Sequence, residues 1–539
     1  MTDPVAELHS HVAEASSSLV EGAVAPPQLE RPPKADLGDY STNAAMALAR
    51  PMRQAPREIA GQLGQVLAER LGGDLERTEV AGPGFLNLFM SDSWYARTLA
   101  EIVAAGDGYG RGDAGERVDV EFVSANPTGP ITVASARHAA YGDALARILE
   151  LAGNTVEREY YVNDHGTQIQ RFGASIGARA RGDDPPPDGY QGDYVTELAG
   201  RIDGAADMHD SELARLGVEL MLEGIAATLE RFGVHMDRFC RESANHEGGA
   251  VEAALARLEE RGHVYRQEGA TWLRTTALGD DKDRVLVRST GELTYFAADI
   301  AYHEDKRERA YDRTIDVLGA DHHGYVKRIA AQWQALGGDP GAFEVVIMQL
   351  VNLLEGGERA RMSKRAGAIV ALDDLLDDIG VDATRWFLLQ RSHETALDLD
   401  LDLARRQSQD NPVYYAQYAH ARIASILRRA GEDRVAEARA AHVAASPERW
   451  HPSARALLKR LAAFGSEVQE AAHRRAPHRI TTYATELAQD FSAFYRDCKV
   501  VGAAEEGGDE DLRIALCAAT MDAIARSLAL LGVSAPSEM

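Results

Sequence analysis

The loop GERARMSKRAG (residues 357–367) holds the side chains best suited to act on a polyphosphate. It combines glycines and three arginines with Lys364, in a 539-residue chain that has only seven lysines. Glycines let such a loop close over a ligand, and its cations can meet the negative charge that develops on a leaving pyrophosphate. We interpret the loop as a phosphate-binding loop; the alternative is an ordinary solvated basic loop.

A second candidate is the stretch SANPTGPITVASARHAAYGD (residues 124–143). It follows a strand-like segment, VDVEFV, and opens a helix-like segment that ends near Gly153. Open α/β sheets bind ligands where strands end, and the free N–H groups of a helix start favour phosphate. The pattern therefore predicts a nucleotide site in which Thr132 and Ser135 offer hydroxyl groups. His138, one turn further on, is either a substitute donor or a plain helix residue.

Three regions of different pattern surround these two stretches. The first begins with a proline-rich segment, is expected to form a helix from about Ser41 to Leu71, and ends in an extended segment, VAGPGFLNLFMS. The second alternates strands and helices as in a Rossmann-type sheet, broken by helices and a hairpin at about 165–290. The third is helical, and its last helix carries an apolar stripe at 4, 3, 4, 3 spacing that predicts a bundle core. We expect an N-terminal α/β module (1–115), a catalytic domain with an insertion (116–404, insertion at about 165–290) and an all-α bundle (405–539).

Composition limits the classes of protein to consider. The net charge of −26 with a pI of about 5.1 would by itself argue against a nucleic-acid partner. Adaptation to high salt is the alternative, because concentrated salt screens global repulsion and leaves local basic patches able to bind. Three distant cysteines form no CxxC zinc pair or disulfide framework. Without a long apolar run or a signal peptide, we expect a cytoplasmic protein with no membrane partner.

Several stretches resemble a known family. RMSKRAG resembles the KMSKS-type loop of class I aminoacyl-tRNA synthetases, and residues 124–143 lie where that class keeps its HIGH motif. Longer stretches are similar to arginyl-tRNA synthetases in the same order along essentially the whole chain: YYVNDHGTQI, TYFAADIAYH, GADHHGY, MSKRAGAIVALDDLLDDIGVDATRWFLL, NPVYYAQYAHARI and LLGVSAP. The resemblance implies an arginine–tRNA ligase that uses ATP with Mg²⁺, L-arginine and the tRNA for arginine, acts as a monomer, and needs no zinc or other protein-bound metal.

The resemblance also implies site residues. A guanidinium presents five donors, so carboxylates are its best acceptors. The arginine-binding set is Glu121, Asn126, Tyr295, Asp299 and His322. The ATP set is Pro127, Thr128, Gly129, Thr132, Ala134, Ser135, Gly319, Asp321, Arg361, Met362, Ser363 and Lys364. Taken singly, Glu121 is equally a strand-end acid, Asp299 a helix-surface charge and His322 a turn residue.

The C-terminal bundle resembles an anticodon-binding domain. The tRNA-binding set that follows is Tyr414, Tyr415, Tyr418, Arg422 and Met539. Unpaired bases stack on aromatic rings and guanidinium planes, although aromatics at this spacing also serve as core. In the N-terminal module Tyr40, Arg50 and Arg53 are candidates for RNA contact or for a solvated face.

The catalytic group implied is Lys364, Ser363, Thr132 and Ser135, and here the chain departs from the family pattern. Thr132, Val133, Ala134 and Ser135 replace His-Ile-Gly-His, and Arg361 replaces the first lysine of the loop. The Ala134 methyl group occupies a position where glycine would let adenine approach closely. Two alternatives stay open: a catalytically impaired paralogue that binds tRNA, and an adenylate-forming ligase for another amino acid.

Overall fold

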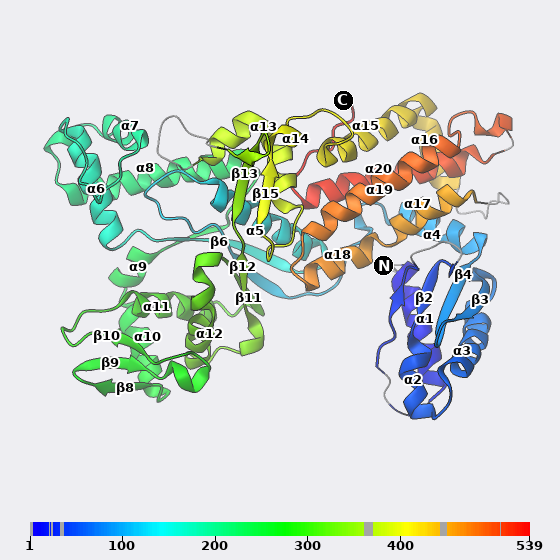
Figure 1. Cartoon of the computed structure of the whole chain (residues 1–539), viewed down its shortest axis with the longest axis horizontal. Helices are drawn as coiled ribbons and strands as arrows, with labels where there is room; N and C mark the ends of the chain where they lie inside the picture. Colours follow the sequence, from blue (N-terminus) through cyan, green and yellow to red (C-terminus); the bar gives the residue numbers. More distant parts are fainter. Residues whose placement is uncertain are drawn as a thin grey trace.

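A computed structural model describes residues 4–20, 22, 25–32, 37–360, 370–441, 450–506 and 508–539 (Figure 1). The catalytic domain and the helical bundle follow one another along the long axis, and the N-terminal module projects beneath the bundle (Figure 1). This arrangement confirms the predicted fold class: an α/β module, a Rossmann-type domain with inserted elements, and an all-α bundle.

The N-terminal module is an antiparallel sheet in the order β1–β2–β4–β3 (Leu29–Glu30, Tyr40–Thr42, Phe85–Met90, Leu75–Ala81), packed with α1 (Pro4–Ser18), α2 (Ala44–Met52) and α3 (Pro56–Leu71). The single helix expected from Ser41 to Leu71 is wrong. Residues 40–42 pair with β4, and the helical part is broken where Arg53 adopts φ 54° before Pro56. Tyr40 is buried against Trp94, so its ring does not face RNA.

The catalytic domain is built on a five-stranded parallel sheet in the order β12–β11–β5–β6–β7 (Phe343–Met348, Arg313–Gly319, Arg117–Glu121, Thr155–Val162, Arg238–Arg241). The central strand β5 is almost wholly buried, as expected for a parallel strand covered on both faces. Helix α5 (Val133–Leu151) joins β5 to β6 and confirms the predicted strand–helix–strand unit.

The inserted segment differs from the prediction. It was expected to be continuous over 165–290, but β7 returns to the parallel sheet beside β6. Two separate insertions result. Helices α6 (Thr167–Ala180), α7 (Asp193–Arg201) and α8 (Asp210–Arg231) precede β7. After β7 come helices α9 (Glu242–Glu247) and α10 (Ala250–Glu260). They are followed by an antiparallel sheet in the order β10–β9–β8 (Arg284–Val287, Ala270–Leu273, Val264–Gln267). Helix α11 (Tyr295–Glu308) then precedes β11, and α12 (Val326–Ala335) joins β11 to β12.

The chain continues through β13 (Val351–Glu355), β14 (Glu358–Arg359), α13 (Leu372–Leu389), β15 (Leu397–Asp400) and α14 (Leu401–Ala404) into the bundle. The bundle comprises α15 (Pro412–Ala430), α16 (Glu432–Ala441), α17 (Pro452–Ala462), α18 (Phe464–His473), α19 (His478–Asp497) and α20 (Glu510–Leu530). In the predicted stripe, Cys517, Ile524 and Leu528 are fully buried.

Buried polar contacts fix the bundle and the module relative to the catalytic sheet. Arg385 on α13 donates to the carbonyl of Leu531, which follows α20, and to the Asp143 carboxylate on α5. Asp39 of the module accepts from the Lys459 ammonium of α17 at 2.9 Å and from Tyr95 Oη of α4 (Asp92–Ala105) at 2.6 Å. These contacts tie the N-terminal module to the bundle and the bundle to the catalytic sheet.

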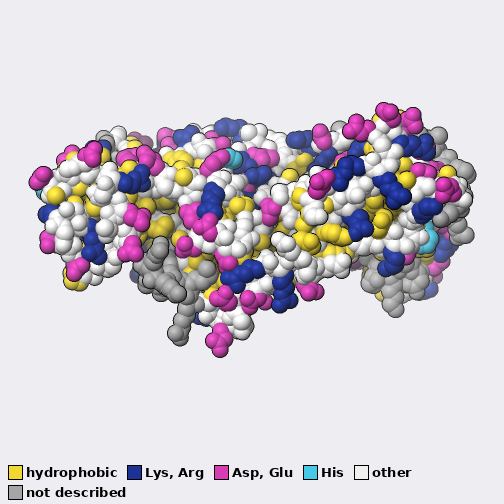
Figure 2. All heavy atoms as spheres, turned by 90° about the horizontal axis from the view of Figure 1, so that it is seen from above, with side chains coloured by type: hydrophobic (Ala, Val, Ile, Leu, Met, Phe, Trp, Pro, Cys, Tyr) yellow, Lys and Arg dark blue, Asp and Glu magenta, His cyan; other side chains and the backbone are white. Residues whose placement is uncertain are grey.

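Acidic and basic side chains are interspersed on the face shown in Figure 2. Many of the arginines form ion pairs with neighbouring carboxylates, such as Arg405 with Asp378 and Glu355. None of the described helices is long and apolar enough to cross a membrane.

Candidate active site and RNA-binding surface

A cavity of about 640 Å³ opens at the carboxyl ends of β5, β6 and β11, beside the start of α5. The full predicted arginine set lines it, together with part of the ATP set: Glu121, Asn126, Tyr295, Asp299, His322, Ala134, Ser135, Gly319 and Asp321. Tyr295 and Asp299 lie one turn apart on α11, as their spacing predicted. Segments far apart in the chain thus supply one pocket, at the edge of the sheet where open α/β folds bind ligands.

Two carboxylates, Asp299 and Glu242, lie in this cavity without a fixed counter-charge. Within the described ranges, no lysine or arginine forms an ion pair with either of them. Burial, reinforced by the charge of Glu121, raises the pKa of Asp299 to about 6 against the lowering effect of His303. Burial and the charges of Asp299 and Asp164 raise the pKa of Glu242 to about 7. A cation placed between the two carboxylates would relieve both shifts.

Sequence reasoning missed Glu242. It lies in the segment interpreted as an insertion, and only the return of β7 to the sheet brings it to the pocket. Tyr161 at the end of β6 also lines the cavity, with its ring 4.2 Å from that of Tyr302. The YYVND stretch was noticed for its family resemblance, but neither residue carries a local signal of its own.

Glu121 occupies a different environment from the other predicted arginine contacts. Its Oε1 accepts from Ser124 Oγ at 2.8 Å, and its Oε2 accepts from Lys306 Nζ at 2.5 Å and Tyr302 Oη at 2.8 Å. Lys306 is fully buried and also pairs with Asp316. Burial alone would lower the Lys306 pKa, but Asp316, Glu121 and Asp119 hold it well above its ordinary value. Lys306 thus holds the Glu121 carboxylate at the cavity wall.

The start of α5 forms the other end of the cavity. Thr132 is the N-cap residue of α5, with its hydroxyl accepting from the Ser135 N–H at 3.3 Å. Ala134 and Ser135 line the cavity, as does His138 one turn further on. Burial, with the nearby charge of Arg137, lowers the His138 pKa to about 4, so its imidazole is neutral at physiological pH. The structure favours His138 as a cavity residue over the plain helix residue.

Other members of the predicted ATP set lie apart. Pro127 and Thr128 are buried, and the Thr128 carbonyl accepts from Tyr194 Oη at 2.8 Å. Gly129 lies beside the same tyrosine, because a Cβ there would be 3.5 Å from its hydroxyl oxygen. These residues shape the loop and are not among the residues that line the cavity.

Of the basic loop, residues 357–360 are described. Arg361, Met362, Ser363 and Lys364 lie outside the described residues. Before them, Arg359 in β14 pairs with Leu354 of β13. After them, the Val370 carbonyl accepts from the Val133 N–H at 3.1 Å, and the Leu372 N–H donates to the Ile131 carbonyl at 2.8 Å. The segment that resumes at residue 370 is therefore hydrogen-bonded to the start of α5.

The bundle carries a partly exposed group of aromatic rings. The rings of Tyr414 and Tyr418 stack with centroids 6.3 Å apart, and the Arg422 guanidinium lies over the rings of Tyr418 and Tyr495. Tyr415 Oη meets Ser492 Oγ at 3.0 Å. Met539 is 53% exposed. The structure brings Tyr414, Tyr418 and Arg422 together and adds Tyr495, which the sequence did not single out.

Comparisons with known proteins agree with this layout. Three family models match: "Arginyl tRNA synthetase N terminal domain" at residues 6–90, "tRNA synthetases class I (R), catalytic domain" at 210–410 and "DALR anticodon binding domain" at 416–539. A curated arginine–tRNA ligase from Frankia alni is 48% identical over 524 residues, covering 95% of this chain and 94% of the relative. The chain belongs to the arginyl-tRNA synthetase family.

Solved structures of arginyl-tRNA synthetases show the same fold. A putative member from Campylobacter jejuni superposes with a TM-score of 0.77 at 33% identity, covering 83% of this chain and all of its own. The enzyme from Thermus thermophilus superposes over the full length of both chains with a TM-score of 0.78 at 24% identity. The arginyl-tRNA synthetase resemblance first noted in the sequence is therefore confirmed.

Proposed function

We propose that this chain attaches L-arginine to the tRNA for arginine and that the cavity at the sheet edge is where arginine is activated. As a member of the family, it is an arginine–tRNA ligase. Arginine reacts with ATP, supplied as its Mg²⁺ complex, to give arginyl-adenylate and pyrophosphate. The arginyl group then passes to the 3′-terminal adenosine of the tRNA, which releases AMP. The observation that carries the site assignment is a buried carboxylate, Glu242, and a half-buried one, Asp299, in a cavity that the start of α5 also lines.

Asp299 and Glu242 hold the guanidinium in this proposal. Each carboxylate can accept charge-assisted hydrogen bonds from the planar fork of donors. Lysine lacks the fork and citrulline lacks the charge, so either would leave a buried carboxylate poorly matched. Tyr295 and His322 border the pocket, and Glu121, held by Lys306, faces the amino-acid end together with Asn126.

The start of α5 takes the nucleotide. Its positive dipole end favours the phosphates, and neutral His138 supplies a donor where the chain lacks both histidines of the HIGH motif. Ser135 adds a hydroxyl. We assign the phosphates to Arg361, Met362, Ser363 and Lys364 of the basic loop, with Lys364 meeting the charge that develops on the leaving pyrophosphate. Gly319 and Asp321 border the adenosine end.

We further propose that the anticodon arm stacks on Tyr414, Tyr418 and Arg422, near Tyr415 and Met539. Partial exposure of a ring pair beneath a guanidinium suits unpaired bases. The domain limits remain 1–115, 116–404 and 405–539. The working form is a cytoplasmic monomer, and the excess of carboxylates reflects adaptation to high salt.

Arginine-dependent exchange of pyrophosphate into ATP tests this function. It should be measured in molar KCl with and without the tRNA for arginine. We expect exchange that depends on arginine and rises with tRNA. A folded protein that binds the tRNA but shows no exchange in either condition would instead be the catalytically impaired paralogue. Exchange driven by another amino acid would identify a different ligase.

A further inference from the structure

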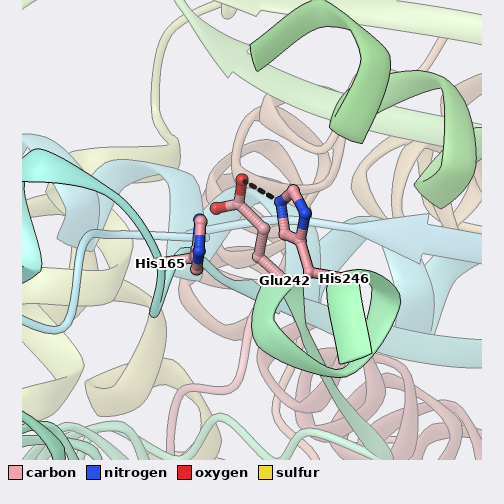
Figure 3. Close-up of side chains that lie close together, drawn as sticks. All are labelled: His165, Glu242 and His246. Atoms are coloured by element: carbon pink, nitrogen blue, oxygen red, sulfur yellow. Dashed lines mark ion pairs between the residues drawn. The ribbon is translucent and has the colours of Figure 1, made fainter. Parts of the chain in front are cut away.

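Three metal-ligating side chains meet beside the arginine pocket: His165, Glu242 and His246 (Figure 3). One ligand atom from each lies within 4.8 Å of the other two. Glu242 and His246 come from successive turns of α9, and His165 comes from the loop between β6 and α6 (Figure 3). Sequence spacing alone could not reveal the cluster, because His165 is separated from the other two by α6, α7, α8 and β7.

The local backbone holds these side chains in place. The Asp164 carboxylate, next to His165, accepts from the N–H and the hydroxyl of Ser243, both at 2.8 Å. These bonds fasten the His165 loop to the first turn of α9. The next residue, Gly166, adopts φ 92°, and a Cβ there would lie 3.1 Å from Tyr295 Oη. Residues outside the cluster, Asp164, Ser243 and Gly166, therefore fix the position of the loop that carries His165.

The carboxylate of Glu242 points to a missing cation. Glu242 is only 3% exposed, and its Oε2 is buried with no hydrogen-bond partner among the described residues. Its Oε1 lies 3.8 Å from His246 Nε2, which is longer than a hydrogen bond. A buried charge without partners is costly, and it is usually paired or bound to metal.

We propose that His165, Glu242 and His246 form a binding site for a divalent transition-metal ion of the Zn²⁺ type. Two imidazoles and one carboxylate are a ligand set that Zn²⁺ uses, with further positions left for water. Imidazole ligands disfavour Mg²⁺ and Ca²⁺, which take oxygen ligands. Small side-chain movements bring three atoms within 4.8 Å to the bond lengths of about 2 Å that zinc requires.

The site has a consequence for the enzyme, and this step rests on the proposed function. A metal ion bound to Glu242 would take up the carboxylate that holds the guanidinium and would place a second positive charge beside it. Zn²⁺ and arginine therefore compete, and the metal inhibits the ligase without being a cofactor of it.

Isothermal titration of ZnCl₂ into the full-length chain, without a polyhistidine tag and without ATP, tests the site. Losing a ligand should cost at least as much as losing a hydrogen-bonding partner of one, which is roughly 10–100-fold in affinity. We expect that loss in His246→Ala and in the exposed-loop variant His165→Ala. The control is His235→Ala, which removes an exposed histidine that pairs with Glu230 away from the cluster and should bind as the parent does.

The competition is tested by repeating the titration with L-arginine present. With arginine at about 100 times its dissociation constant, the apparent zinc affinity should fall about 100-fold. Equal zinc binding by the parent and a folded His165→Ala/His246→Ala double variant would overturn the site. Zinc binding that these variants weaken but arginine does not affect would overturn the competition. If the chain fails to bind arginine, the proposed function fails, yet the loss of zinc binding in the histidine variants still decides the site.

Discussion

Replacing Asp299 by Asn removes one negative charge from the arginine pocket and keeps the volume of the side chain. Asp299 lies on α11 one turn beyond Tyr295, and no described lysine or arginine pairs with it. The substitution therefore breaks no ion pair in the free protein. Its effect on arginine reports the interaction with the guanidinium and little else.

The magnitude follows from the bonds that are lost. A hydrogen bond to a charged group contributes about 1.5–3 kcal/mol, and the Asn side chain retains one acceptor oxygen but no charge. At about 1.4 kcal/mol for each factor of ten, the variant should bind arginine about 10–100-fold more weakly. The affinity for ATP should not change, because Asp299 faces the guanidinium and not the start of α5, where the nucleotide is proposed to bind.

The assay is pyrophosphate exchange at varied arginine and saturating ATP and tRNA, with the arginine KM and the ATP KM measured separately. Asp305→Asn is the matched control, because it neutralises an aspartate on the same helix that pairs with Arg309 at 3.1 Å and is half-exposed. If Asp299→Asn leaves the arginine KM at the level of Asp305→Asn, the assignment of Asp299 to the guanidinium is wrong. An equal rise in both KM values would instead indicate general disruption of the cavity.

Three further outcomes follow from the same contacts. Arginine affinity should be highest above the raised pKa values of Glu242 (about 7) and Asp299 (about 6), since only the ionised carboxylates attract the guanidinium. It should fall by up to about tenfold per pH unit between the two values and by up to about a hundredfold per unit below both, and a flat binding profile from acid to neutral pH would contradict this. Lys306→Met leaves buried carboxylates, Glu121 and Asp316, without their cation. It should lower the free energy of unfolding, measured by urea denaturation, by about 3–5 kcal/mol. Unchanged stability would show that the contacts of Lys306 with these carboxylates are not ionic. Gly142→Ala places a Cβ 2.1 Å from Phe122 Cγ and should cost about 1–3 kcal/mol in the same measurement; a neutral effect would mean that β5 and α5 can separate.

Much of the fold was predictable, because it depends on patterns local in the sequence. The strand–helix–strand unit at 117–162 and the apolar stripe of α20 are confirmed. The errors occurred where tertiary pairing overrides local pattern. Residues 40–42 are recruited into a sheet by β4, and the short strand β7 is recognisable only by its pairing with β6.

The candidate site was predictable only in part, for a similar reason. Glu121, Asn126, Asp299 and His322 were singled out by their motifs, and the cavity brings them together. Glu242 carries no signal until β7 places α9 at the pocket. The partners of Glu121 could not be foreseen either, because Lys306 lies 185 residues further along the chain and is brought to it only by the packing of α11.

The most direct measurement is a crystal structure of the chain with L-arginine bound. The account predicts the guanidinium within hydrogen-bonding distance of the Asp299 and Glu242 carboxylates, with the amino-acid end towards Glu121 and the start of α5. Arginine bound elsewhere, or in this cavity with its guanidinium away from both carboxylates, would contradict it.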